Sequence, residues 1–219
     1  MNKEIVFNRK NYKRDVLRKF GRDDYELSYE TYHTGIDIVI GDYIAQRFKG
    51  YNTILEVCTG AGFMLIPLAK IVRNIITVEI NSEYLKQAKH NVKVAGIKSN
   101  IIFILGDILE EKIMSKIPKI DAAFLDPDWS VSVKHNPIHI TKLSDMHPPI
   151  DILLEQISKK TQNFAIRLPK QLNLNELKSF PPHELEKIYL DGDFKFYCVY
   201  FGELTRKIGI TKFEAFSLS

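Results

Sequence analysis

From residue 53 onward, short apolar runs alternate with segments whose apolar residues recur at helical spacing. The runs have the length of strands, and the segments between them are long enough for helices. Strands that alternate with helices form βαβ units, in which the strands are parallel and helices cover both faces of the sheet. Since such crossovers are right-handed, the pattern predicts an α/β fold with a doubly wound, mostly parallel, Rossmann-like sheet.

The predicted elements have distinct boundaries. The strands are expected at 53–57, 75–79, 101–105, 120–125 and 163–168, and the helices at 63–72, 82–95, 150–160 and 174–180. Ser82 is expected to cap the second of these helices, and Gly96 to end it. Two further runs, 187–190 and 195–202, flank Asp191-Gly192-Asp193 and predict an antiparallel hairpin at the sheet edge. The stretch 130–149 is expected to be irregular, and long irregular segments in compact domains are often functional.

The charge of the chain is distributed unevenly. Residues 1–22 hold eight basic and two acidic side chains, which gives +6, while the whole chain carries +4, so the remainder sums to −2. A basic segment beside a near-neutral body predicts a polyanionic partner, although a solvated helix face is the alternative. We therefore divide the chain into a basic N-terminal arm, 1–34, and a main domain, 35–219.

Several classes of protein and site are not favoured. The start of the chain lacks a signal-peptide pattern, and no apolar run approaches the ~20 residues that cross a bilayer, so no membrane is expected. Cys58 and Cys198 are far apart and neither belongs to a CxxC pair, which favours a reducing, cytoplasmic location. The six histidines show no ligand spacing with cysteine or acidic residues, so no metal is predicted.

Acidic residues stand at the ends of four successive predicted strands: Glu56, Glu79, Asp107 and Asp126. In open α/β sheets, ligands bind outside the carboxyl ends of the strands. After the first strand, Gly60 and Gly62 allow a sharp turn and a close approach of ligand to backbone. Taken singly, the glycines could form an ordinary strand-to-helix turn and Asp107 could cap a helix. The four acidic residues in order favour a ligand site.

The chemistry of these strand ends distinguishes two cofactor classes. A dinucleotide fingerprint would place a third glycine where Leu65 stands. Acidic strand ends instead suit a cationic, hydroxyl-rich ligand without phosphate, and S-adenosylmethionine is such a ligand. An acid at the end of the second strand can accept hydrogen bonds from ribose hydroxyls. The predicted donor-binding residues are Thr34, Glu56, Cys58, Thr59, Gly60, Gly62, Glu79, Ile80, Asp107 and Ile108.

The fourth strand ends in Asp126-Pro127-Asp128-Trp129, which is suited to placing a methyl acceptor. Because a sulfonium donor is already activated, the protein mainly orients the acceptor. A carboxylate and a proline-fixed carbonyl can hold an amino group, and an aromatic ring can stack on the flat ring that bears it. Trp129, the only tryptophan, could alternatively be a core residue. We predict Asp126, Pro127 and Trp129 as the catalytic, acceptor-side residues.

With these residues in place, the chain resembles class I S-adenosylmethionine-dependent methyltransferases, and more narrowly the trimethylguanosine synthase family of cap guanine-N2 RNA methyltransferases. The resemblance runs from about residue 25 to 204. Besides the strand ends it rests on His90-Asn91-Val92, Ala95-Gly96-Ile97, Ser158-Lys159-Lys160, Leu168-Pro169-Lys170 and Tyr200-Phe201-Gly202-Glu203-Leu204. It implies a helix over 35–48, a seven-stranded methyltransferase sheet with an antiparallel C-terminal hairpin, and S-adenosylmethionine as cofactor.

The resemblance also implies a function. In that family the motif after the fourth strand ends in Pro-Pro-Trp and two glycines, and its tryptophan, matched by Trp129, stacks on a modified guanine. Here Asp128 replaces the second proline, and Ser130-Val131 replace the glycines. The expected function is N-methylation of RNA at an exocyclic amine of guanine (N2), with RNA held by the basic segment 1–22. Two alternatives stay open: a methyltransferase for a protein side-chain amide or a small-molecule amine, and a non-catalytic RNA-binding module that keeps the fold.

Overall fold

The computed structural model describes residues 9–133 and 136–218. Its centre is an eight-stranded sheet in the order β10-β8-β9-β7-β4-β1-β2-β3. The strands on one side are all parallel: β3 (Asn100–Leu105), β2 (Asn74–Glu79), β1 (Thr53–Val57), β4 (Ala122–Leu125) and β7 (Phe164–Pro169). The α/β fold with a mostly parallel sheet is therefore confirmed.

The C-terminal part of the sheet holds the predicted hairpin and one strand more. β8 (His183–Leu190) and β9 (Asp193–Phe201) are antiparallel, and β9 is also antiparallel to β7. The final strand, β10 (Gly209–Ala215), runs parallel to β8 at the sheet edge. The expected number of seven strands is therefore wrong. The polar sequence of β10 conceals it, because an edge strand buries little of its length.

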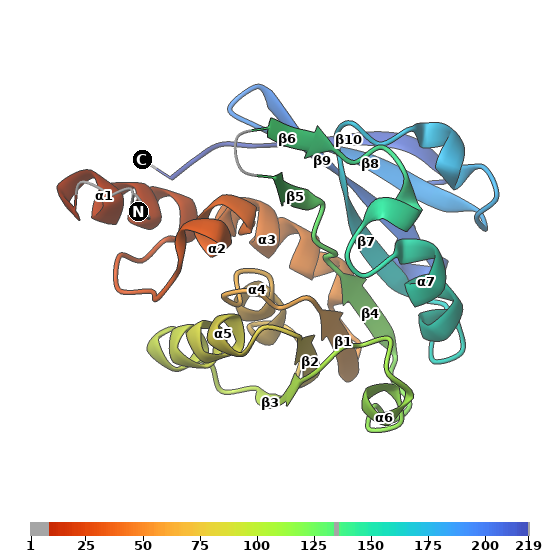
Figure 1. Ribbon diagram of the computed structural model, residues 1–219, viewed down its shortest axis with the longest axis horizontal. Coiled ribbons are helices and arrows are strands. Elements are labelled where there is room, and N and C mark those ends of the chain that lie inside the picture. The colour runs from red at the N-terminus through yellow and green to blue at the C-terminus, as the bar shows by residue number, and fades with distance from the viewer. Residues whose placement is uncertain (1–8, 134–135, 219) are drawn as a thin grey trace.

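Helices cover both faces of the sheet (Figure 1). One face packs against α1 (Arg9–Phe20), α3 (Ile38–Ala45), α4 (Leu65–Ala69) and α5 (Ser82–Val94), and the other against α6 (Glu111–Met114) and α7 (Ile150–Ser158). Alternate strand residues serve the two cores: Ile54 faces the first and Leu55 the second. The outermost strand β3 is only partly covered, since Ile102 and Leu105 are exposed. Short 3₁₀ turns lie at Gln46–Phe48, Leu143–Asp145, Leu174–Leu177 and Gly202–Leu204.

Four local expectations are corrected by the structure. The helix expected at 63–72 is shortened to α4, and the segment 174–180 holds a 3₁₀ turn. Asn81, not Ser82, caps α5, because its side-chain oxygen accepts the N–H groups of Glu83 and Tyr84. The stretch 130–149 is not wholly irregular, since β5 (Ser130–Val133) and β6 (Asn136–His139) pair as a small antiparallel sheet.

The N-terminal helix α1 packs into the first of the two hydrophobic cores, the one that holds Ile54. α1 contributes Val16 and Phe20 to it, and the ring of Phe20 stacks on that of Phe63 with centroids 3.5 Å apart. α2 (Tyr29–Thr34) begins at a capping box formed by Ser28 and Thr31. The stacked rings hold α1 beside the loop that follows β1, and the Thr31 hydroxyl of α2 donates to Oε1 of Gln87 on α5 at 2.9 Å. The division of the chain at residue 34 stays a prediction.

Candidate active site

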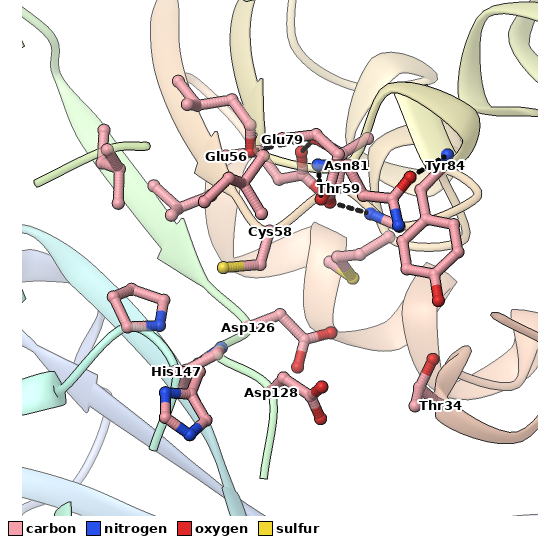
Figure 2. A pocket seen from close by; sticks show the side chains of 18 of the residues that line it. Thr34, Glu56, Cys58, Thr59, Glu79, Asn81, Tyr84, Asp126, Asp128 and His147 are labelled. Carbon is pink, nitrogen blue, oxygen red and sulfur yellow. Dashed lines mark hydrogen bonds between the residues drawn. The ribbon is translucent and has the colours of Figure 1, made fainter. Parts of the chain in front are cut away.

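One cavity of about 590 Å³ opens where the carboxyl ends of four parallel strands meet. Its walls are the loops after β1, β2, β3 and β4, together with α2 and the segment 147–149 (Figure 2). Adjacent parallel strands end at one edge of the sheet, so residues distant in sequence come together there. All of the predicted site residues except Gly62 line this cavity.

The loop after β1 forms the floor of the cavity. Its backbone takes positive φ at Cys58 (65°), Gly60 (54°) and Gly62 (86°). A side chain on Gly60 would meet nothing within 4 Å, so a ligand can approach the backbone there. A Cβ on Gly62 would lie 3.3 Å from Ala88 of α5. Gly62 therefore allows the close packing of the loop on a helix, whereas Gly60 faces the cavity.

Glu56 is the most deeply buried acid of the site, with 1% of its surface exposed. Its Oε2 accepts a hydrogen bond from the hydroxyl of Thr59 at 2.8 Å and another from the hydroxyl of Thr77. Burial raises the pKa of Glu56 to about 7, although the two threonine hydroxyls oppose this by stabilising the carboxylate. Glu56 thus ties β1 to β2 beneath the cavity.

Glu79, at the end of β2, links two loops. Its Oε2 accepts the N–H of Gly60 at 2.8 Å, and its Oε1 accepts the N–H of Asn81 at 2.9 Å. Burial raises the pKa of Glu79, and these backbone hydrogen bonds oppose the rise. Both oxygens are therefore oriented by the backbone before any ligand arrives. Ile80, which follows, is exposed and lines the cavity.

The loop after β3 supplies the third wall. The Oδ1 of Asp107 accepts the N–H of Leu109 at 2.9 Å, which holds the turn. Ile108 is buried and lines the cavity beside Asp107. The sequence left two roles open for Asp107, a cap or a ligand residue. In the structure Asp107 stabilises the turn and also borders the cavity.

Asp126, after β4, is held by a residue that the sequence did not single out. One nitrogen of Arg167, Nη1, donates to both carboxylate oxygens of Asp126, at 3.2 and 3.0 Å. The same nitrogen donates to the carbonyl oxygen of Thr34 at 2.8 Å. Burial raises the pKa of Asp126, the charge of Arg167 opposes the rise, and Asp128 adds to it.

Trp129 lies beside this ion pair. The guanidinium of Arg167 lies 4.6 Å from the centroid of the Trp129 ring system and 4.7 Å from that of Phe196. Asp128 exchanges two backbone hydrogen bonds with His147, at 2.7 and 2.9 Å. Figure 2 shows the carboxylates of Asp126 and Asp128 side by side in the cavity. The loop after β4 is thus fixed on both sides.

Sequence reasoning missed several residues of the cavity wall. Arg167 contacts wall residues without lining the cavity, and its signal was available, because it is the one charged residue of β7, a strand otherwise apolar and buried. Several of the missed wall residues come from neighbouring segments and gave no local signal: Glu30, Asn81, Tyr84, His147, Pro148 and Pro149. Thr34 lines the cavity, while its hydroxyl donates to the carbonyl of Glu30 at 3.0 Å.

The residues that line the cavity fit S-adenosylmethionine. Carboxylates on three walls favour a cationic ligand, Glu79 presents oriented acceptors suited to hydroxyl groups, and Gly60 leaves space for a close approach. The volume lies in the range of ordinary small-molecule sites. Among the residues that the structure describes, no group of three or more metal-ligating side chains is arranged to hold an ion. In the same part of the chain, no helix is long and apolar enough to span a membrane.

Comparison with known proteins places the chain in a family. Residues 51–204 match the model of the family described as RNA cap guanine-N2 methyltransferase. The trimethylguanosine synthase of Schizosaccharomyces pombe is 25% identical over 197 residues, covering 84% of this chain and 81% of that protein.

Solved structures show the same fold. A structure titled as a putative methyltransferase from Porphyromonas gingivalis W83 superposes with a TM-score of 0.73 at 18% identity, covering 88% of this chain but only 48% of that one. TrmK of M. capricolum, solved with S-adenosyl-homocysteine, superposes with a TM-score of 0.53 at 17% identity, covering 80% of this chain and 70% of that one. This chain is an S-adenosylmethionine-dependent methyltransferase and belongs to the RNA cap guanine-N2 methyltransferase family.

Proposed function

We propose that this enzyme methylates RNA at an exocyclic amine of guanine, N2. The observation that carries the proposal is a shared cavity, which joins the acidic ends of β1–β3 to Asp126, Pro127 and Trp129. A donor side and an acceptor side therefore share one space. The family supports RNA as the acceptor class.

On the donor side, we assign roles by chemistry and place. Glu79 accepts hydrogen bonds from the ribose hydroxyls, and Asp107 with Ile108 borders the adenine. Gly60, Cys58, Thr59 and Ile80 shape the walls around the donor. Glu56 contributes by holding the loop through Thr59, and Thr34 borders the end that takes the donor's carboxylate. The bound donor supplies an activated methyl group.

On the acceptor side, the chain orients the amine. The Asp126 carboxylate and the Pro127 carbonyl accept hydrogen bonds from the acceptor's NH₂, which directs the nitrogen lone pair toward the methyl carbon. Trp129 stacks on the base that bears the amine. Positioning of this kind is the main contribution needed from the protein, because the positively charged sulfonium of the donor would leave as a neutral thioether.

The basic segment is assigned to the phosphates of the RNA. In the described part of α1, the exposed cations Lys13, Arg14 and Arg18 lie on a helix that Val16 and Phe20 anchor to the core. Cations that neutralise phosphates supply affinity for RNA that does not depend on its sequence. We retain residues 1–34 as the N-terminal arm, with the basic segment 1–22 as its RNA-contacting part, and residues 35–219 as the methyltransferase domain.

The direct test is transfer of a tritiated methyl group to total RNA, followed by digestion and nucleoside analysis. We expect label in N2-methylguanosine, and no label with the Trp129→Ala variant. Label in protein or in small molecules instead would support the first alternative. Donor binding without transfer to any acceptor would support the second, a binding module that keeps the fold.

A further inference from the structure

Arg167 joins two walls of the cavity, the loop after β4 and α2, through one guanidinium. Nη1 contacts the carboxylate of Asp126 on the acceptor side and the carbonyl of Thr34 at the end of α2. The guanidinium carbon of the same side chain lies over the Trp129 ring system, 4.6 Å from its centroid. These contacts connect the residues proposed to hold the amine, to stack on the base and to border the donor.

The strand register explains how Arg167 reaches these partners. Ile166 of β7 is paired with Leu125, the last residue of β4. Arg167 is therefore level with Asp126, one residue beyond the end of that strand pair. On the other side of β7 it is paired with Cys198 of β9, two residues from Phe196. The pairing of β7 with β4 therefore places the Arg167 side chain where the loop after β4 begins.

The burial of Arg167 indicates whether this arginine contributes to stability or to function. The side chains of Arg167 and Asp126 are only 9% and 17% exposed. A buried ion pair often adds no stability over apolar residues of similar size, because both charges lose their hydration. The Nε of Arg167 is also buried without a hydrogen-bond partner in the described structure. A gain in stability therefore does not account well for a buried arginine at this position. The orientation of Asp126 and Trp129 accounts for it better.

We propose that Arg167 is a positioning residue of the methyl-transfer reaction, which orients the Asp126 carboxylate and the Trp129 ring for the acceptor. Its Nη1 occupies one side of the Asp126 carboxylate, so the remaining lone pairs are directed to the cavity. Its guanidinium covers part of Trp129, so the base stacks on the ring surface left open to the cavity. The acceptor roles rest on the proposed function, whereas the orientation of Trp129 can be tested without any acceptor.

The charge environment of Asp126 provides a second readout. The groups that face it are Arg167 from β7, Asp128 from the same loop, and Glu56 and Cys58 from β1 and its loop. Arg167 is the cation of this set, and it opposes the rise in the pKa of Asp126 that burial causes. Loss of Arg167 therefore raises that pKa further, so that Asp126 becomes protonated at a higher pH.

The test compares full-length wild type with Arg167→Met and Arg167→Lys. For Arg167→Met we expect kcat/KM for RNA to fall on the order of 100-fold, as a misplaced acceptor predicts. The donor Kd from calorimetry should stay within threefold, and the acid limb of the pH–rate profile should move to higher pH. Arg167→Lys keeps the charge but not the flat group, so its acid limb should stay near that of wild type while kcat/KM falls.

The single tryptophan gives a reading that needs no substrate. Acrylamide quenching of Trp129 fluorescence should increase in both variants, because its ring is less covered. Lys70→Met is the matched control: it removes the cation of an exposed pair with Asp42, at 2.9 Å, outside the cavity wall. It should change neither quenching nor kcat/KM.

The outcomes separate the two proposals. If wild type fails to methylate RNA, the proposed function is wrong, and quenching still tests the orientation of Trp129. If wild type is active and a folded Arg167→Met enzyme keeps kcat/KM within threefold, the positioning role is wrong. A parallel loss of donor affinity would also overturn it. If Arg167→Met does not fold, the same comparison of kcat/KM and of donor Kd is made with Arg167→Lys.

Discussion

Replacement of Glu79 by glutamine offers a stringent test of the donor site. Such a change is usually conservative, since the amide keeps the shape of the carboxylate. Here both oxygens of Glu79 accept backbone N–H groups, from Gly60 at 2.8 Å and Asn81 at 2.9 Å. Whichever way the amide turns, its NH₂ must face one of these N–H donors. Glu79→Gln is therefore expected to behave like Glu79→Ala.

The magnitude follows from the hydrogen bonds that are lost. A hydrogen bond to a charged group contributes roughly 1.5–3 kcal/mol, which corresponds to about 10- to 150-fold in affinity. We expect the Kd for S-adenosylmethionine to rise by that factor in either variant, with further loss where the Gly60 loop loses its support. Because burial raises the pKa of Glu79, wild-type affinity should also fall, as pH is lowered, sooner than an ordinary carboxylate would predict.

Isothermal titration calorimetry with S-adenosylmethionine measures this effect directly. Glu83→Gln is the control, because Glu83 is exposed on α5 and pairs with Lys86 outside the cavity wall. It should leave the Kd unchanged. A folded Glu79→Gln protein that binds the donor within threefold of wild type would show that the carboxylate is not a donor ligand.

Four further predictions concern the acceptor, the RNA and the stability of the fold. Trp129→Ala should abolish methylation while the donor Kd changes little; retention of full activity would contradict the stacking role. Changing Lys13, Arg14 and Arg18 to glutamine should reduce the slope of log K against log salt for single-stranded RNA by up to about 2, and an unchanged slope would return α1 to the solvated-face interpretation. The side chains of Arg47 and Glu184 are 3% and 2% exposed, and two hydrogen bonds of 2.8 and 3.0 Å join them. Because Arg47→Met leaves the Glu184 carboxylate buried without its cation, it should lower the free energy of unfolding by about 3–5 kcal/mol in urea titrations. Burial alone would raise the pKa of Glu184, but Arg47 and further donors lower it from 4.5 to about 2. The stability this supplies, about 3 kcal/mol, is present above pH 4.5 and should be lost as pH falls toward 2; a flat pH dependence in wild type would refute it.

Local patterns determined the parallel half of the sheet. β1 was predicted residue for residue, and β2, β3 and β4 within two residues, because buried parallel strands are continuous apolar runs between turns. The same reasoning located the cavity, since strand ends in such a sheet meet at one edge. It failed for β10, whose short polar sequence becomes a strand only through pairing with β8.

The sequence alone was enough to predict most of the polar residues that border the cavity, because strand ends and turns are local features. The tertiary structure decided what each residue contacts. It separated Gly62, which lies against Ala88, from Gly60, which faces the cavity. It brought Arg167 to Asp126, 41 positions away in the chain, and to Trp129. Contacts of this kind arise from the pairing of β4 with β7, and no local sequence pattern encodes strand order across a sheet.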